Sequence, residues 1–234
     1  MKILPFLSKI AVLLLVLMMP VMSGCTPKQG ALMNASSFGF GSLQAQPNSG
    51  VVKFHKLKVQ SLDQFFVEVK ALDREIVQSR NALQKSHLAL KQLSKGDSLS
   101  AEIQKLIRKR KLTLTRNEMG LPKLTAASGH VRANQIAKSV NQLSRQIKKV
   151  SKNLPEMIQQ AQHLGVQSKS LISDAPNDIK KAIANGRIPA NQFAGTMLKT
   201  NQNLGQVVTV IHHANELKNN VQSNSKDLKN LLGM

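Results

Sequence analysis

Apolar residues recur at steps of three and four positions over most of the chain beyond residue 60. Three long series are present, from Leu62 to Leu93, from Ile136 to Leu171 and from Phe193 to Leu232. This spacing places the apolar side chains along one stripe of an α-helix. A helix with so long a stripe is not stable alone in water, so the stripes must cover one another. The pattern therefore predicts a bundle of helices.

Residues that start and stop helices divide the chain into five expected helical segments. Ser61 and Gln64 have the spacing of a capping box, and Gly96 is placed as a C-terminal stop. A second, shorter series starts at Asp97 or Ser98. We expect helices over residues 62–95, 98–117, 124–173, 177–185 and 190–231.

Prolines and glycines mark the interruptions between these segments. Gly120-Leu121-Pro122 ends the second helix, Asp174-Ala175-Pro176 ends the third, and Pro189 opens the last. Pro155 falls inside the third series without shifting its register. Because an interior proline removes one hydrogen bond and clashes with the preceding turn, it predicts a kink or a fresh helical start there.

The predicted fold class is all-α, an elongated antiparallel bundle or coiled-coil rod of three to four helices after a flexible N-terminal tether. Short connections make neighbouring helices antiparallel. Trp and Tyr are absent and aromatic residues make up 3% of the chain, so a thick globular core is not expected. A strict 3.5-residue period also serves self-association, and the sequence leaves open whether the stripes pair within one chain or between chains.

Residues 26–60 have no sustained helical period and are rich in Gly, Ser, Asn and Gln, which predicts a flexible tether. Near its end, three lysines alternate with apolar residues between Lys53 and Val59. That alternation is compatible with a short strand or with a patch that lies on anionic lipid.

The chain begins with the layout of a secretory signal. Lys2 and Lys9 form a positive leader, and an uncharged apolar run from Ile10 to Met22 follows, too short to span a bilayer. Directly behind it stands Met22-Ser23-Gly24-Cys25, with the chain's single cysteine. An apolar residue, two small residues and a cysteine resemble the recognition box of bacterial lipoprotein signals.

This resemblance covers residues 1–25 alone and implies cleavage after Gly24, fatty acylation of Cys25 and attachment to a membrane through lipid. In Gram-negative relatives Asp after the cysteine favours the inner membrane, so Thr26 implies the outer membrane, facing the periplasm; in other bacteria the outer face of the cell membrane is implied. The expected organisation is a signal peptide over 1–24, a lipidated tether over 25–60 and a basic bundle over 61–234.

We expect no enzyme, cofactor or metal site. The six histidines are dispersed, and none are spaced four apart for a shared metal ion. His212 and Glu216 have that spacing, but such a pair is typical of a weak surface ion pair. No serine stands in a Gly-x-Ser-x-Gly turn, and Cys25 is committed to lipid.

The second informative feature is the excess of positive charge. The chain has 33 Lys and Arg against 12 Asp and Glu, and loss of Lys2 and Lys9 lowers its formal charge from +21 to +19. Few acids, such as Glu102 before Lys105 and Asp178 before Lys181, are spaced to neutralise a lysine. Two basic clusters are candidate anion-binding residues, namely Lys105, Arg108, Lys109, Arg110, Lys111 and Arg116, and the helical stripe Arg145, Lys148, Lys149 and Lys152.

Export makes nucleic acid a remote partner, and stacking aromatic residues are lacking. We therefore expect a lipid-anchored, non-catalytic envelope protein whose basic helical rod binds an anionic lipid, polymer or protein of the envelope. The alternative is a coiled-coil accessory subunit of an envelope secretion or transport complex.

Overall fold

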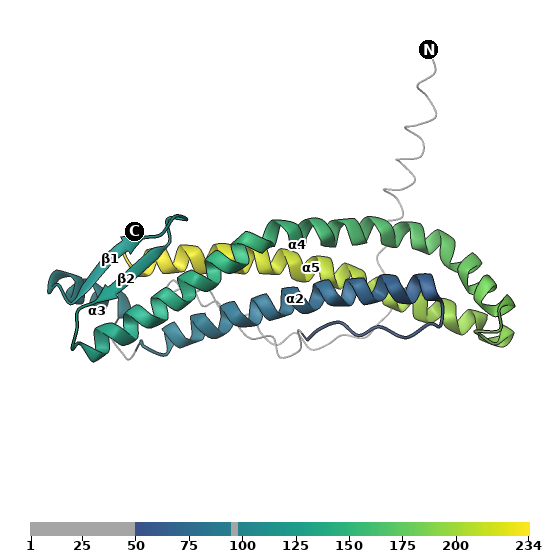
Figure 1. Cartoon of the computed structure of the whole chain (residues 1–234), viewed down its shortest axis with the longest axis horizontal. Helices are drawn as coiled ribbons and strands as arrows, with labels where there is room; N and C mark the ends of the chain where they lie inside the picture. The colour runs from purple at the N-terminus through teal and green to yellow at the C-terminus, as the bar shows by residue number, and fades with distance from the viewer. Residues whose placement is uncertain (1–49, 95–97) are drawn as a thin grey trace, which may run out of the picture. The chain divides into compact units, whose positions relative to one another are not determined.

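The computed structural model describes residues 50–94 and 98–234, and this part of the chain is mostly helical (Figure 1). Its elements, in chain order, are α2 (Gln60–Lys91), α3 (Leu99–Arg108), β1 (Leu112–Arg116), β2 (Pro122–Ala126), α4 (Val131–Ala184), the 3₁₀ turn η1 (Ala190–Gln192) and α5 (Phe193–Leu231). Gly24, Cys25, Gly96 and Asp97, together with the expected tether up to residue 49, lie outside the described residues.

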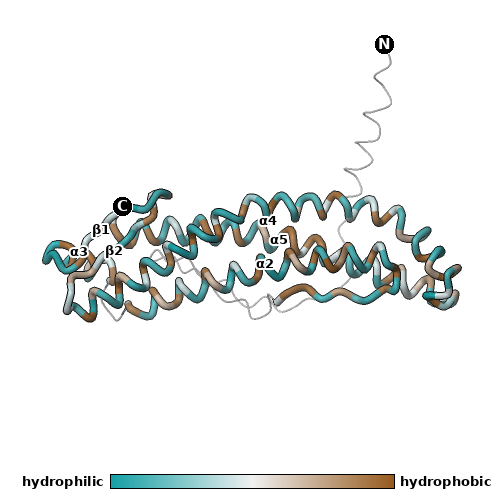
Figure 2. Tube along the Cα trace, in the orientation of Figure 1, coloured by the Kyte–Doolittle hydropathy of each residue, from teal (hydrophilic) through white to brown (hydrophobic). Residues whose placement is uncertain are grey.

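The three long helices α2, α4 and α5 pack against one another in pairs. Ser61 at the start of α2 bonds Asp178 near the end of α4, so these two helices run antiparallel. α5 returns along α4 after the turn that includes Gly186, and it therefore runs parallel to α2 (Figure 1). Apolar and polar residues alternate along each long helix, as the predicted stripes require (Figure 2).

The predicted stripes form the core of a single chain. Ile76 of α2, Ile136 and Ile147 of α4 and Leu217 of α5 are at most 1% exposed. The pairing of the stripes is therefore intramolecular, a point that the sequence left open. Burial of a Leu or Ile side chain contributes about 1.5–3 kcal/mol, so this shared core is the main stabilising term.

The second expected helix is wrong over half its length, because residues 112–126 form a β-hairpin. α3 starts behind Ser98, whose Oγ accepts from the N–H of Ala101 at 3.1 Å, as expected, but it ends at Arg108. Leu112 to Arg116 then pairs antiparallel with Pro122 to Ala126. Leucine alternates with threonine here, a two-residue period that places Leu112 inside and Thr113 outside. Threonine also favours strands over helices.

The third expected helix starts late and does not end where expected. α4 begins at Val131 rather than at 124, and it continues as one helix through Pro155 and Pro176 to Ala184. The fresh start at Pro155 and the separate helix over 177–185 are therefore wrong, whereas the alternative of a kink at Pro155 stays a prediction. Beyond Pro176, Ile179 and Ala182 remain buried, so the packed stripe continues past the proline. That burial offsets the cost of an interior proline, about 3 kcal/mol.

The last expected helix agrees closely with η1 and α5, whereas α2 begins and ends earlier than expected. The capping box is wrong, since the N-cap is Val59 and makes no side-chain bond. Instead Asp63 accepts hydrogen bonds from the N–H groups of Leu57 and Lys58 at 2.8 and 2.9 Å.

The end of the expected tether is packed on the bundle. We call residues 50–59 the strap. Leu57 and Val59 are each 3% exposed, and the rings of Phe54 and Phe66 stack with their centroids 5.1 Å apart. The strap contains no strand, and its apolar residues face the protein rather than lipid. A tether ending at residue 60 is therefore wrong for these ten residues.

Candidate functional site: the basic hairpin end

The first basic cluster surrounds the connection between α3 and β1. Lys105 and Arg108 lie on α3, Lys109 to Lys111 form the connection, and Arg116 ends β1. All except the half-buried Lys111 are exposed to solvent. The positive charge is thus held at the surface by a helix end and a strand. We call α3, the hairpin and the first half of α4 the hairpin end.

Arg110 has an unusual backbone conformation at the end of α3. Its φ is +55°, and the N–H of Lys111 donates to the carbonyl of Leu106 at 2.8 Å. The N–H of Arg110 donates to Ile107 at 2.9 Å. This pair of bonds is the helix-ending motif in which glycine usually occupies the left-handed position. Arginine there costs about 1 kcal/mol, and it adds a cation at the exposed turn.

Side chains of α4 hold the hairpin in place. The N–H of Leu124 donates to Oδ1 of Asn141 at 2.8 Å, and Nδ2 of Asn141 donates to the carbonyl of Leu124 at 2.7 Å. One residue of α4 thus bonds β2 as a neighbouring strand would. The hydroxyl of Ser144 donates to the carbonyl of Pro122 at 2.6 Å. The hairpin is therefore fixed on α4 directly before the second basic cluster.

The second basic cluster lies on the exposed face of α4. Arg145, Lys148, Lys149 and Lys152 are all exposed. The turn of the hairpin reaches this cluster, since Nζ of Lys148 lies 2.7 Å from Oε2 of Glu118. The hydrogen bond and the charge of Lys148 lower the pKa of Glu118 below its ordinary value. Lys148 is therefore partly neutralised within the chain.

The fold brings the two clusters together in part. Arg116 is the register partner of Pro122, whose carbonyl bonds Ser144, one residue before Arg145. The C-terminal end of β1 therefore lies at the start of the α4 cluster. Lys109 to Lys111 lie at the other end of β1, about 17 Å away for five strand residues.

Acidic residues expected to neutralise cations have different partners. Glu102 accepts from Nε and Nη2 of Arg132 at 2.8 and 2.7 Å rather than pairing with Lys105. These hydrogen bonds lower the pKa of Glu102. The two-pronged contact joins α3 to α4 and leaves Lys105 without an acidic partner among the described residues. Asp178 and Lys181 do approach each other, with Oδ1 and Nζ 3.9 Å apart.

A second polar feature, buried between α2 and α5, was not predicted. Asp73, Arg80 and His87 stand seven residues apart on α2, and each contacts a polar residue of α5. We call these contacts the polar ladder. Its α5 members are His213, Glu216 and Asn224.

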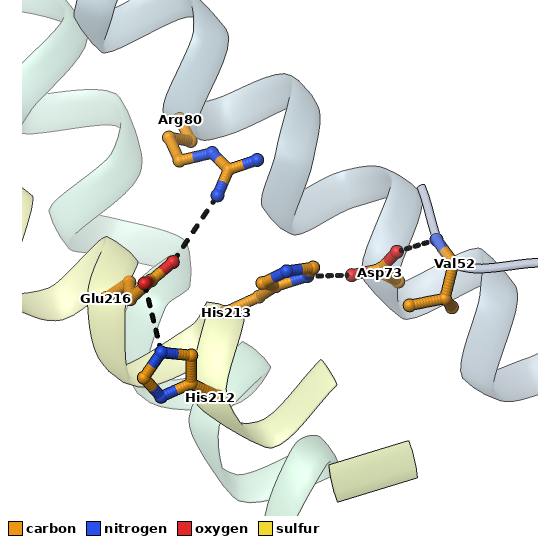
Figure 3. Close-up of polar contacts among 6 residues, drawn as sticks. All are labelled: Val52, Asp73, Arg80, His212, His213 and Glu216. Carbon is orange, nitrogen blue, oxygen red and sulfur yellow. Dashed lines mark hydrogen bonds and ion pairs between the residues drawn. The ribbon is translucent and has the colours of Figure 1, made fainter. Parts of the chain in front are cut away.

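The contact of Asp73 with His213, the first of the polar ladder along α2, also holds the strap (Figure 3). Asp73 is fully buried; its Oδ1 accepts from Nδ1 of His213 at 2.7 Å and its Oδ2 accepts from the N–H of Val52 at 2.6 Å. Further along the strap, the amide of Asn203 on α5 bonds both the N–H and the carbonyl of His55 at 2.8 Å. Asp73 thus joins three segments of the chain.

The other rungs combine charged and neutral contacts. Nη1 of Arg80 lies 3.4 Å from Oε2 of Glu216, and Nε2 of His212 lies 3.0 Å from the other oxygen of that carboxylate (Figure 3). The expected surface pair of His212 and Glu216 is therefore present. In the third rung Nδ1–H of His87 donates to Oδ1 of Asn224 at 2.7 Å, and burial lowers the pKa of His87.

A seven-residue repeat of polar residues was the available sequence signal for the polar ladder. Asp73, Arg80 and His87 follow the same period as the leucine stripe beside them. Their partners on α5 could not be identified, because the register between two helices distant in sequence is set by packing.

Within residues 50–94 and 98–234, no three or more His, Cys, Asp and Glu residues are grouped so as to hold a metal ion. None of the helices in this part of the chain is both long and apolar enough to span a bilayer.

A shallow groove of about 580 Å³ lies between α2 and α4, lined by residues that include Glu68, Glu75 and His163.

Comparison of the chain with protein-family models, with curated proteins and with solved structures finds no match.

Proposed function

We propose that this is a lipid-anchored, non-catalytic envelope protein, and that its hairpin end binds an anionic component of the envelope. The observation that carries the binding part is the exposed basic surface around β1. Lys105, Arg108, Lys109 and Arg110 are exposed there, and the nearby acids Glu102 and Glu118 are engaged by Arg132 and Lys148. Because these acids do not neutralise the first basic cluster, its positive potential can attract an anionic ligand.

The anchor part of the proposal rests on the sequence. Cys25 stands where bacterial lipoprotein signals carry their acylated cysteine. In a Gram-negative cell Thr26 favours the outer membrane with the protein facing the periplasm, and in other bacteria the anchor would lie in the outer face of the cell membrane. Two or three acyl chains give stable attachment, at about 0.8 kcal/mol per buried methylene. The 24 residues between Cys25 and Gly50 would join the lipid to the strap.

We further propose that the bundle is an elongated rod with coiled-coil packing. α4 has 54 residues, which corresponds to a length of about 80 Å at 1.5 Å per residue. The parallel alignment of α2 and α5, with the α2 residues of the polar ladder seven positions apart, supports the coiled-coil part. Because the apolar stripes are buried within one chain, an accessory subunit would have to bind its partner through another surface.

The anchor is tested by intact-mass spectrometry of the protein purified from membranes. The expected N-terminus is Cys25 carrying a diacylglyceryl group, and Cys25→Ser should remain unprocessed and unlabelled by radioactive palmitate. An unmodified thiol at Cys25 in the membrane-derived protein would overturn the anchor.

The anion-binding surface is tested with vesicles that contain 30% anionic phospholipid and with purified lipopolysaccharide, at low and high salt. The test variant replaces the exposed residues Lys105, Arg108 and Lys109 by Gln, and the control replaces the exposed residues Lys169, Lys180 and Lys199 by Gln, which lowers the net charge equally. We expect the test variant to lose about tenfold in affinity and the control much less. Equal losses would mean that total charge, rather than this surface, determines binding.

A further inference from the structure

The hydrogen bonds on either side of the hairpin show which of its residues bond across the sheet and which face outward. The N–H of Ala127 donates to Lys111 and the N–H of Asn117 donates to Leu121. Together with the antiparallel register, this means that residues 113 and 115 exchange bonds with β2. The N–H and carbonyl groups of Leu114 and Arg116 therefore point away from β2.

The two outer edges of the hairpin differ. The outward groups of Leu124 and Pro122 on β2 are satisfied by Asn141 and Ser144. On β1, no hydrogen bond within the described part of the chain reaches the outward groups of Leu114 or Arg116. Such a free edge is a template for another strand.

The free edge is short and accessible. Leu112 is 2% exposed, so the accessible part of the β1 edge begins after this residue. Leu114 is half-buried, whereas Thr113, Thr115 and Arg116 are exposed. Four backbone groups, two donors and two acceptors, are thus presented over a stretch of three residues.

Positive charge flanks this edge on both sides. The exposed turn with Arg108, Lys109 and Arg110 precedes β1, and Arg116 ends it. We propose that β1 accepts an extended, acidic segment of a partner protein as an added third strand. The inference rests on the proposed function and specifies the chemistry of its anionic partner.

Only a polypeptide can pair with the backbone groups of the β1 edge, which excludes the other anionic partners from this role. Phospholipid head groups and sugar phosphates supply charge but no series of alternating N–H and C=O groups at the spacing of a strand. A second copy of this chain would place the same cations against each other across the shared edge. Residues 26–49 of the chain itself contain one lysine and no acid, so they lack the complementary charge.

The test uses the full chain in detergent and a fluorescein-labelled ten-residue peptide of alternating Thr and Val with two Asp or Glu residues at each end. The matched peptide is identical but N-methylated at its four central residues, which keeps its charge and removes the N–H groups of those four residues. We expect the methylated peptide to bind at least tenfold more weakly at low salt.

Amide exchange locates the contact. With the unmodified peptide bound, the amides of Leu114 and Arg116 should exchange more slowly, while those of Thr113 and Thr115, already bonded to β2, should change little. Unchanged exchange at residues 114 and 116 would overturn the added strand.

A matched pair of variants separates charge from pairing. Arg116→Ala and Arg116→Pro both remove the cation, but only proline removes the outward N–H, and proline is tolerated at such edge positions. We expect Arg116→Pro to bind the peptide about fivefold more weakly than Arg116→Ala, with equal helical circular dichroism.

The outcomes distinguish this inference from the proposed function. Equal binding of both peptides, with vesicles or lipopolysaccharide still bound, overturns the added strand and leaves the anionic surface standing. No binding of peptide, vesicle or lipopolysaccharide at low salt overturns both.

Discussion

The polar ladder and the hairpin end use similar residue types in opposite ways. In the polar ladder, Asp73 and His213 are almost fully enclosed and bonded to each other. At the hairpin end, Lys109 and Arg110 face solvent and have no acidic partner among the described residues. Burial makes an unpaired charge costly, whereas exposure leaves it free for a ligand. The contacts of the polar ladder align α2 with α5, whereas the exposed cations of the hairpin end are the basis for the binding that we propose there.

The largest effect is expected from Asp73→Ala. Removing this carboxylate leaves the N–H of Val52 and the imidazole of His213 buried without an acceptor. Loss of one partner of a buried pair costs about 3–5 kcal/mol of unfolding free energy. Chemical denaturation followed by circular dichroism measures it, and vesicle binding by the folded variant should be unchanged. A loss below about 1 kcal/mol would contradict the structural role of this contact.

Asn141→Ala is expected to release the hairpin from α4. It removes the donor and the acceptor that bond Leu124, each worth about 1 kcal/mol. The unfolding free energy should fall by about 2 kcal/mol, and the amide of Leu124 should exchange faster. Gln142→Ala, at the neighbouring position of the same helix, is the control. Slow exchange at Leu124 in Asn141→Ala would show that other contacts hold the strand.

Arg110→Gly is expected to stabilise the fold and weaken anion binding. Glycine relieves the left-handed strain of this position, for a gain of about 0.5–1 kcal/mol, and removes one exposed cation. Arg110→Ala keeps the strain and removes the charge, so it should weaken binding equally without the gain in stability. Thermal unfolding and vesicle binding measure the two effects. Equal stability of Gly and Ala variants would argue against strain at Arg110.

The smallest effect concerns pH. Because burial lowers the pKa of His87 below 6.5 in the folded state, the unfolded chain takes up this proton first as pH falls. The unfolding free energy should therefore decrease as pH falls through about 6.5 toward the lower folded pKa. Burial raises the pKa of the nearby Asp227 above its ordinary value of 3.8. As pH falls toward 3.8, the folded chain therefore binds this proton first, and the unfolding free energy increases there.

His87→Gln isolates the contribution of His87, since glutamine is neutral throughout this range. Denaturation between pH 5.5 and 7.5 should show a shallower pH dependence for the variant than for the wild-type chain. Identical slopes would mean that His87 does not titrate differently in the folded and unfolded states.

The sequence predicted the helical class and the residues of the core because periodicity is a local property. The steps of three and four from Leu62, Ile136 and Phe193 required long amphipathic helices, and their stripes are buried. The hairpin was missed because its alternating period covers two segments of five residues. The continuation of α4 past Pro176 depends on distant packing, which no local signal reveals.

The sequence by itself determined that this chain is basic, that its long segments are amphipathic, and that its single cysteine, Cys25, directly follows Ser23 and Gly24. The tertiary structure decided which charges are neutralised, because an ion pair such as Glu102 with Arg132 joins residues thirty positions apart. It also decided that Asp73 is an interior residue and that the edge of β1 is open. The charge of a side chain follows from its residue type alone, whereas its burial and its hydrogen-bond partners depend on which distant segments pack against it.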